Sequence, residues 1–206
     1  MSDDFKIERI FPCPVYVARR DSILDSTEEK EIIDIIEKDT NRENGTSNNH
    51  YIFNTKLKKI REFCEQHIKI YVKEVLNPVE ELDFYITQSW LNVIEPGGNI
   101  HRHLHSNSII SGTFYVSTVE NDSIRFIDPI GSLKSRIEFK TIEYNVWNST
   151  NWGYNVTPHD LLLFPSWLEH NVNPNPDATT TRISIAFNVF AKGNFGTKDT
   201  LNELIL

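Results

Sequence analysis

The sequence lacks the features of a membrane-spanning or secreted protein. It has no run of about 18 apolar residues, the length that a membrane-spanning helix needs. Its N-terminus, MSDDFKIER, lacks the basic and then apolar order of a secretory signal. We therefore expect a soluble, cytoplasmic protein with no membrane partner.

Cysteines and basic residues are also scarce. The two cysteines, Cys13 and Cys64, are far apart and form no CxxC motif, which argues against a disulfide framework and a thiolate zinc site. The 21 Lys and Arg residues are outnumbered by 29 Asp and Glu, giving a net charge of −8. Without a basic stripe, such a chain is a poor match for the polyanionic backbone of a nucleic acid.

The sequence does contain enough apolar and aromatic residues for one core. Its 206 residues are 39% hydrophobic and 11% aromatic, which suits one substantial core and is short for two. We predict a single domain, 1–206, in which 1–80 forms an N-terminal strand and supporting helices. Residues 81–192 would form the main β core and 193–206 a C-terminal tail. The oligomeric state, including a homodimer, is left open.

The first predicted elements are a strand and a helix. Residues 9–18 indicate a short strand, and Pro12 and Pro14 place it at a sheet edge because proline cannot donate to a neighbouring strand. Ser26, with Glu29 three residues later, has the form of a capping box and predicts the start of a helix.

The rest of the chain changes from helical to strand patterns. Residues 41–55 are rich in turn formers and are predicted to be a loop that reaches over a site. From Lys56 to Val75 apolar residues recur every three or four positions, which predicts a helix. Helices followed by many short strands predict an α+β fold, mainly β, with a sandwich or barrel core. The predicted strands are 84–94, 109–117, 123–127, 135–144, 160–164 and 182–190.

Three histidines stand at alternate positions in the segment PGGNIHRHLHS. In a strand, alternate side chains share a face, so His101, His103 and His105 would project together. Two such imidazoles with a third donor can hold a divalent transition metal and leave positions open for substrate. Gly97 completes the G-x5-H-x-H opening of cupin metal sites. The alternative is a set of surface histidines on an exposed strand.

A second pair of segments suggests a carboxylate site. DLLLFPSWLEH ends in His170, RISIAFNVF begins with Arg182, and a hairpin turning near Pro176 would place the two residues opposite each other, roughly 5 Å apart. An arginine can hold a carboxylate with two parallel hydrogen bonds, and Ser184 on the same face could add a third. This predicts a metal ligand beside a clamp for a small keto acid. The alternative for Arg182 is a surface salt bridge.

The segments HLHSNSIISGTFYV, DPIG, LLLFPSWLEHNV and RISIAFNVF together resemble the Fe(II)- and 2-oxoglutarate-dependent oxygenases. They are most similar to a small group with H-x-H-P-x-S-x-x-S-G-x-x-Y and F-P-S-W-x-x-H motifs, over much of 90–190. The resemblance implies a double-stranded β-helix (jelly-roll, cupin-like) core, one Fe(II), 2-oxoglutarate and O₂. It also implies that His103 and His170 bind the metal and that Arg182 and Ser184 grip the distal carboxylate. The same resemblance implies that Tyr115, Asn92 and Asn188 line the co-substrate pocket.

The sequence departs from this superfamily at one position. Most members have His-x-Asp or His-x-Glu where this chain has His103-Leu104-His105. Because a neutral imidazole replaces a carboxylate, the net charge of the metal site would be one unit more positive than in those members. His105 is our candidate for the third metal ligand and catalytic residue, with Asp128 or water as rivals. Replacement of the motif's usual proline by Ser106 is minor in comparison.

Three functions remain open. The first is a 2-oxoglutarate- and Fe(II)-dependent dioxygenase, a hydroxylase-type oxidoreductase, acting on a peptide side chain or a small metabolite. The second is a cupin-type dioxygenase or isomerase that uses a three-histidine metal and no keto acid. The third is a non-catalytic jelly-roll binding module. Substrate contacts are expected from 41–55 and from 145–158, which contains Trp147, Trp152 and Tyr154, although ordinary surface loops have the same appearance.

Overall fold

The structure is a computed structural model that describes residues 5–41, 45–79, 81–131 and 140–206. Its helical elements are α1 (Ser26–Asp39), the 3-10 turn η1 (Ile52–Asn54), α2 (Lys58–Tyr71) and the π-helical turn η2 (Val72–Leu76). None of the helices within the described ranges has the length and apolar character needed to cross a bilayer. The strands are β1 (Tyr16–Arg19), β2 (Asp83–Ile94), β3 (Ile100–His103), β4 (Ile110–Ser117), β5 (Ser123–Ile127), β6 (Asn151–Asn155), β7 (Asp160–Pro165), β8 (His170–Val172), β9 (Arg182–Lys192), β10 (Asn194–Phe195) and β11 (Leu204–Ile205).

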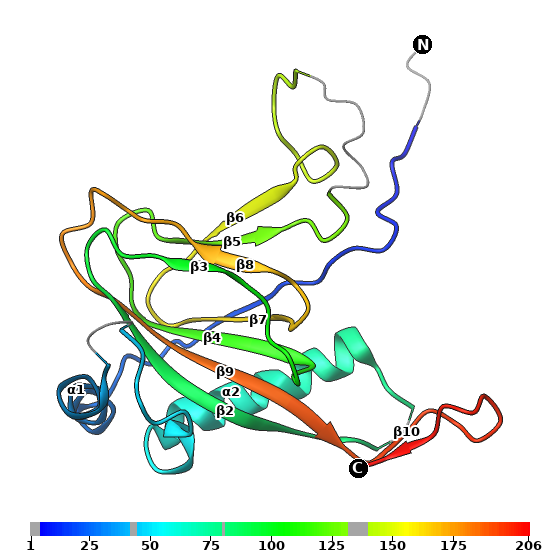
Figure 1. The fold of residues 1–206 in the computed structure, drawn as a ribbon, viewed down its shortest axis with the longest axis horizontal. Helices are drawn as coiled ribbons and strands as arrows, with labels where there is room; N and C mark the ends of the chain where they lie inside the picture. The colour runs from blue at the N-terminus through cyan, green and yellow to red at the C-terminus, as the bar shows by residue number, and fades with distance from the viewer. Residues whose placement is uncertain (1–4, 42–44, 80, 132–139) are drawn as a thin grey trace.

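Two antiparallel sheets form the core, as the α+β, mainly β prediction required. The larger sheet has the order β1-β7-β4-β9-β2 and the smaller one has the order β3-β8-β5-β6. Figure 1 shows the smaller sheet stacked over the larger, with α1 and α2 on the outer side of the larger sheet. Along the chain, strands β2 to β5 and strands β6 to β9 alternate between the two sheets, which is the jelly-roll arrangement.

Strand β9 shows how the sequence divides the two faces of the larger sheet. Ile185, Phe187 and Val189 belong to the apolar cluster that includes residues of α1 and α2. Because successive side chains of a strand point to opposite faces, Arg182 and Ser184 point between the sheets. A second apolar cluster lies on that inner side, and its buried members are Tyr115, Ile124, Phe126, Val156, Leu162, Phe164 and Leu168.

The N-terminal elements follow the sequence analysis with one shift. Strand β1 begins after both prolines and lies at the edge of the larger sheet, as predicted. The capping box of α1 is formed by Asp25 and Glu28, so the predicted pair Ser26 and Glu29 was wrong by one residue. The Asp25 carboxylate accepts hydrogen bonds from the backbone N–H groups of Thr27 and Glu28. An aspartate caps a helix as well as a serine does, so the pattern alone did not decide between them.

The predicted strands miss several short elements of the structure. Strands β2, β4, β5, β7 and β9 match predicted segments, whereas β3, β6 and β8 were not among them, and the predicted tail 193–206 contains a two-stranded sheet of β10 and β11. Of the predicted strand 135–144, residues 135–139 lie outside the described residues, and 140–144 form no strand. Strands of three to five residues carry too few positions for a period-two pattern to show.

The predicted hairpin between His170 and Arg182 is wrong. His170 lies in the smaller sheet, where its Cα partners are His103 and Phe126. Arg182 lies in the larger sheet opposite Ile94. The turn-forming segment between them carries the chain from one sheet to the other instead of closing a hairpin. Turn formers mark where a chain reverses, but they do not say which strand it joins next.

Candidate metal centre

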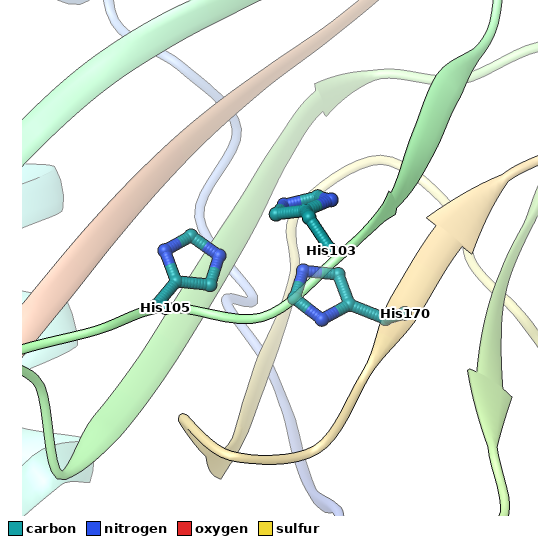
Figure 2. A group of neighbouring side chains, drawn as sticks. All are labelled: His103, His105 and His170. Atoms are coloured by element: carbon teal, nitrogen blue, oxygen red, sulfur yellow. The ribbon is translucent and has the colours of Figure 1, made fainter.

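Three histidines converge at one end of the smaller sheet (Figure 2). His103 ends β3 and His170 begins β8, and the two are direct antiparallel partners. His105 lies two residues beyond β3, where its backbone N–H donates to the carbonyl oxygen of Ser166 at 3.0 Å. One potential ligand atom from each imidazole lies within 4.8 Å of the others. Across the described parts of the chain, this is the one group of His, Cys, Asp or Glu with such spacing.

Backbone carbonyls fix the protonation of two of the rings. His103 Nδ1 lies 2.8 Å from the carbonyl oxygen of His101, and His170 Nδ1 lies 3.0 Å from that of Leu168. A carbonyl oxygen only accepts hydrogen bonds, so a neutral ring with this contact carries its proton on Nδ1. Nε2 is then left with a free lone pair, which is the arrangement usual for histidines that bind metals. His101 contributes its carbonyl, and its own exposed ring lies outside the group.

Burial keeps two of the three rings uncharged. His170 packs edge-on against Phe164 at 4.8 Å between ring centroids, and His105 stacks on Trp90 at 5.8 Å. Burial is the main reason that the pKa values of His105 and His170 are lowered to about 4, and the neighbouring His103 contributes to this lowering. At neutral pH both imidazoles are therefore unprotonated, as metal binding requires.

A chain of serine hydroxyls supports the segment that carries His105. Ser166 Oγ lies 2.8 Å from Ser108 Oγ and 2.9 Å from Ser111 Oγ. Ser111 and Ser166 are buried, and the chain joins the start of β4 to the end of β7. We did not single out these residues from the sequence, although both motifs of the resemblance contain them. Their signal was serine at fixed offsets from the clustered histidines.

The residues that we predicted to bind the co-substrate lie on the inner face of the larger sheet. Ser184 on β9 has Asn92 and Tyr115 as its Cα partners on β2 and β4. Tyr115 Oη and Asn188 Oδ1 are buried without a hydrogen-bond partner among the described residues. Burial raises the pKa of Tyr115 to about 12, so its phenol remains protonated and able to donate. Buried polar atoms without partners favour a polar ligand at this face.

Arg182 has a partner that the sequence analysis did not identify. Its Nε lies 2.9 Å and 3.1 Å from the two carboxylate oxygens of Asp122, and both side chains are at least 96% buried. The guanidinium carbon lies 5.0 Å from the centre of the Tyr115 ring. Arg182 does form a salt bridge, but it is an internal one that joins the two sheets. Nothing in the local sequence marks Asp122, which lies in a turn 60 residues away.

The remaining candidates lie apart from the histidines. Asp128, the rival third ligand, is not part of the group, and its Oδ1 accepts a hydrogen bond from the backbone of Ile130. A cavity of about 420 Å³ is lined by residues 120–123 and 173–177, and it includes Asp122 but none of the three histidines. Trp147 and Trp152 are each 46% exposed.

Comparisons with known proteins agree with this arrangement. Residues 88–188 match the family described as "Putative 2OG-Fe(II) oxygenase". That segment contains all three histidines and all five predicted co-substrate residues. No curated protein was found to be similar in sequence.

Solved structures share the fold of this chain. HygX from Streptomyces hygroscopicus, with nickel, 2-oxoglutarate and hygromycin B bound, is 11% identical with a TM-score of 0.55, covering 86% of this chain and 82% of that one. EctD from S. alaskensis with bound Fe is 13% identical with a TM-score of 0.59, covering 86% and 72%. A Pseudomonas putida prolyl-4-hydroxylase is 13% identical with a TM-score of 0.52, covering 84% and 91%. At these identities the likeness concerns the fold.

Proposed function

We propose that this chain, whose residues 88–188 belong to the 2-oxoglutarate- and Fe(II)-dependent oxygenase family, binds one Fe(II) through His103, His105 and His170. With 2-oxoglutarate and O₂ as co-substrates, it would hydroxylate a small metabolite or a peptide side chain. The observation that carries the proposal is the convergence of three imidazoles, two of them held with Nε2 free by backbone carbonyls.

The donor set fits the metal. Imidazole nitrogen is a good ligand for divalent iron, and three protein ligands on one side leave positions open for a chelating co-substrate and O₂. Three neutral ligands leave the full charge of Fe(II) uncompensated, whereas a carboxylate would offset part of it. An anionic keto acid would supply that charge. Bound Fe(II) and 2-oxoglutarate together provide the oxidising chemistry for C–H hydroxylation, with succinate as co-product.

The chain's own residues supply the co-substrate pocket. Tyr115 on β4, Ser184 on β9 and Asn92 on β2 form one row across the sheet. The protonated Tyr115 phenol can donate a hydrogen bond to a carboxylate. Arg182 lies two residues from Ser184 on the same face and provides the positive charge. Asn188, further along β9, lies beside the His105 side chain and raises the pKa of His105, which partly opposes the effect of burial.

Loop 45–55 is proposed to contact the substrate. Thr46 and Tyr51 form bridges with β2, so the loop follows this strand. The loop places the His50 ring 6.5 Å from Trp90, which in turn stacks on His105. His50 is exposed, so a substrate can reach it beside the metal centre. The hygromycin B and 5-hydroxyectoine complexes of structural neighbours support a small polar metabolite as substrate.

One observation favours a second candidate. A donor set of three histidines without a carboxylate is what a cupin-type dioxygenase or isomerase would use, and such an enzyme would need no keto acid. Under this alternative Arg182 and Asp122 would be a purely structural ion pair.

Anaerobic titration with Fe(II), followed by 2-oxoglutarate, tests the proposal. The weak visible charge-transfer band of the iron chelate should appear in the native protein and be absent from His103→Ala. Metal binding without the band would favour the cupin-type enzyme. Failure to bind metal would leave the chain as a non-catalytic binding module.

A further inference from the structure

The ion pair between Asp122 and Arg182 connects the two sheets inside the jelly roll. Asp122 immediately precedes β5 of the smaller sheet, and Arg182 is the first residue of β9 in the larger one. Their side chains are 3% and 4% exposed. The backbone also holds Asp122, because its N–H donates to Val119 and its carbonyl accepts from Val156. Asp122 is therefore a fixed anchor for the guanidinium.

The anchor occupies only one of the donor groups of Arg182. Both carboxylate oxygens lie near Nε, at 2.9 Å and 3.1 Å, and the Tyr115 side chain is a further neighbour that interacts with the guanidinium. The hydrogen bonds to Asp122 use neither of the terminal groups, Nη1 and Nη2. They form the fork that binds a carboxylate through two parallel hydrogen bonds. The Tyr115 ring packs against the same guanidinium, which further limits its orientations.

We propose that Asp122 is a positioning residue for the co-substrate: it holds Arg182 through Nε so that Nη1 and Nη2 face the distal carboxylate of 2-oxoglutarate. This inference rests on the proposed function. An arginine side chain has many rotamers, and fixing one of them opposes ligand binding unless the fold has already done so. Asp122 also neutralises a buried guanidinium while no co-substrate is bound, which offsets the cost of desolvating it.

A competing arrangement makes the opposite prediction. If the Asp122 carboxylate occupied the place of the co-substrate carboxylate, 2-oxoglutarate would have to displace it, and removing Asp122 would tighten binding. If the ion pair only stabilised the fold, removing Asp122 would weaken the binding of all keto acids to the same extent.

Isothermal titration of Ni(II)-loaded protein with two keto acids separates these cases. The ligands are 2-oxoglutarate and 2-oxobutyrate, which has the chelating keto acid but no distal carboxylate. Asp122→Ala should weaken 2-oxoglutarate binding about tenfold or more and change 2-oxobutyrate binding less than about twofold. Asp122→Asn keeps a hydrogen-bond acceptor for Nε, so its affinity for 2-oxoglutarate should lie between those of Asp122→Ala and the native protein. Asp177 is an exposed acidic residue that lines the same cavity as Asp122, and Asp177→Asn should bind 2-oxoglutarate as tightly as the native protein does.

The outcomes that overturn the inference differ from those that overturn the proposed function. Unchanged or tighter 2-oxoglutarate binding by the Asp122 variants, or equal weakening of both keto acids, would refute the positioning role. Absence of 2-oxoglutarate binding by the native metal-loaded protein would refute the proposed function and this inference with it. If Asp122→Ala does not fold, Asp122→Asn carries the comparison.

A second measurement needs neither metal nor co-substrate. In the native protein the Nε–H proton of Arg182 should exchange slowly with solvent in NMR spectra, because Asp122 holds it in a buried hydrogen bond. Exchange should become faster in Asp122→Ala. An equally slow proton in this variant would show that another group orients Arg182.

Discussion

His103 and His170 are direct partners across β3 and β8, and their ring centroids lie 4.3 Å apart. This pairing brings together two histidines that are 67 positions apart in the chain. The third ring, that of His105, is 5.1 Å from His103 and 5.3 Å from His170. His101 lies on the same strand as His103 but outside the group, and so it provides an internal control for the metal site.

Replacement of His105 should affect metal binding far more than replacement of His101. We expect His105→Ala to weaken Fe(II) binding by more than the roughly 10- to 100-fold typical of residues that only support metal ligands. His101→Ala should change it little, because His103 Nδ1 contacts the His101 carbonyl and not its ring. Anaerobic titration calorimetry measures the Fe(II) affinity of each variant. Equal affinities for the two variants would exclude His105 as the third ligand.

Removal of Arg182 should destabilise the fold as well as the co-substrate site. Arg182→Leu leaves the Asp122 carboxylate buried without its partner, which we expect to lower the free energy of unfolding by about 3–5 kcal/mol. Arg182→Leu combined with Asp122→Leu should recover most of this loss but not 2-oxoglutarate binding. Urea denaturation and ligand titration separate the two effects. A stable Arg182→Leu single variant would contradict the buried ion pair.

The metal-free protein should lose stability as the pH falls. The folded-state pKa of His105 and His170 is about 4, whereas histidine in an unfolded chain titrates near 6.5. As the pH falls, the unfolded state therefore takes up protons at a higher pH than the folded state does. The stability that is present above about pH 6.5 is lost as the pH falls towards 4. From pH 7 to 5 we expect a loss of about 2–4 kcal/mol for the two groups together.

Chemical denaturation of the metal-free protein across this range is the measurement. The variant with both His105→Asn and His170→Asn is the control, because it cannot titrate at these positions and should show a flatter dependence. An unaltered slope in this variant would assign the acid sensitivity to other groups.

The sequence predicted the histidine cluster better than its surroundings. HxH and the distal histidine stand in motifs with characteristic spacing, and the alternating pattern of β9 predicted that Arg182 and Ser184 share a face. By contrast, the position of Arg182 relative to His170 depends on which sheet each strand joins, and local turn signals carry no such information. The Asp122 partner depends on a contact between the two sheets, which no periodicity records.

Gly112 of the S-G motif is required by packing, not by chemistry. A Cβ added at this position would lie 2.1 Å from Cζ of Phe187, a fully buried ring on β9 that has no room to move. We expect Gly112→Ala to lower the free energy of unfolding by about 1–3 kcal/mol or more, as overpacked cores do. Gly153→Ala on β6 is the matched control, because its Cβ would meet nothing within 4 Å.

A second substitution can test the cause of the Gly112→Ala effect. Phe187→Leu removes the ring that the new methyl group would strike, so the combined variant should lose less stability than the sum of the two single variants. Thermal or urea denaturation of the four proteins gives this coupling directly. Metal affinity of the folded protein should stay unchanged throughout, because Gly112 and Phe187 meet on the face of the sheet that packs against the helices. Strict additivity of the two substitutions would show that the Phe187 ring is not what excludes a side chain at position 112.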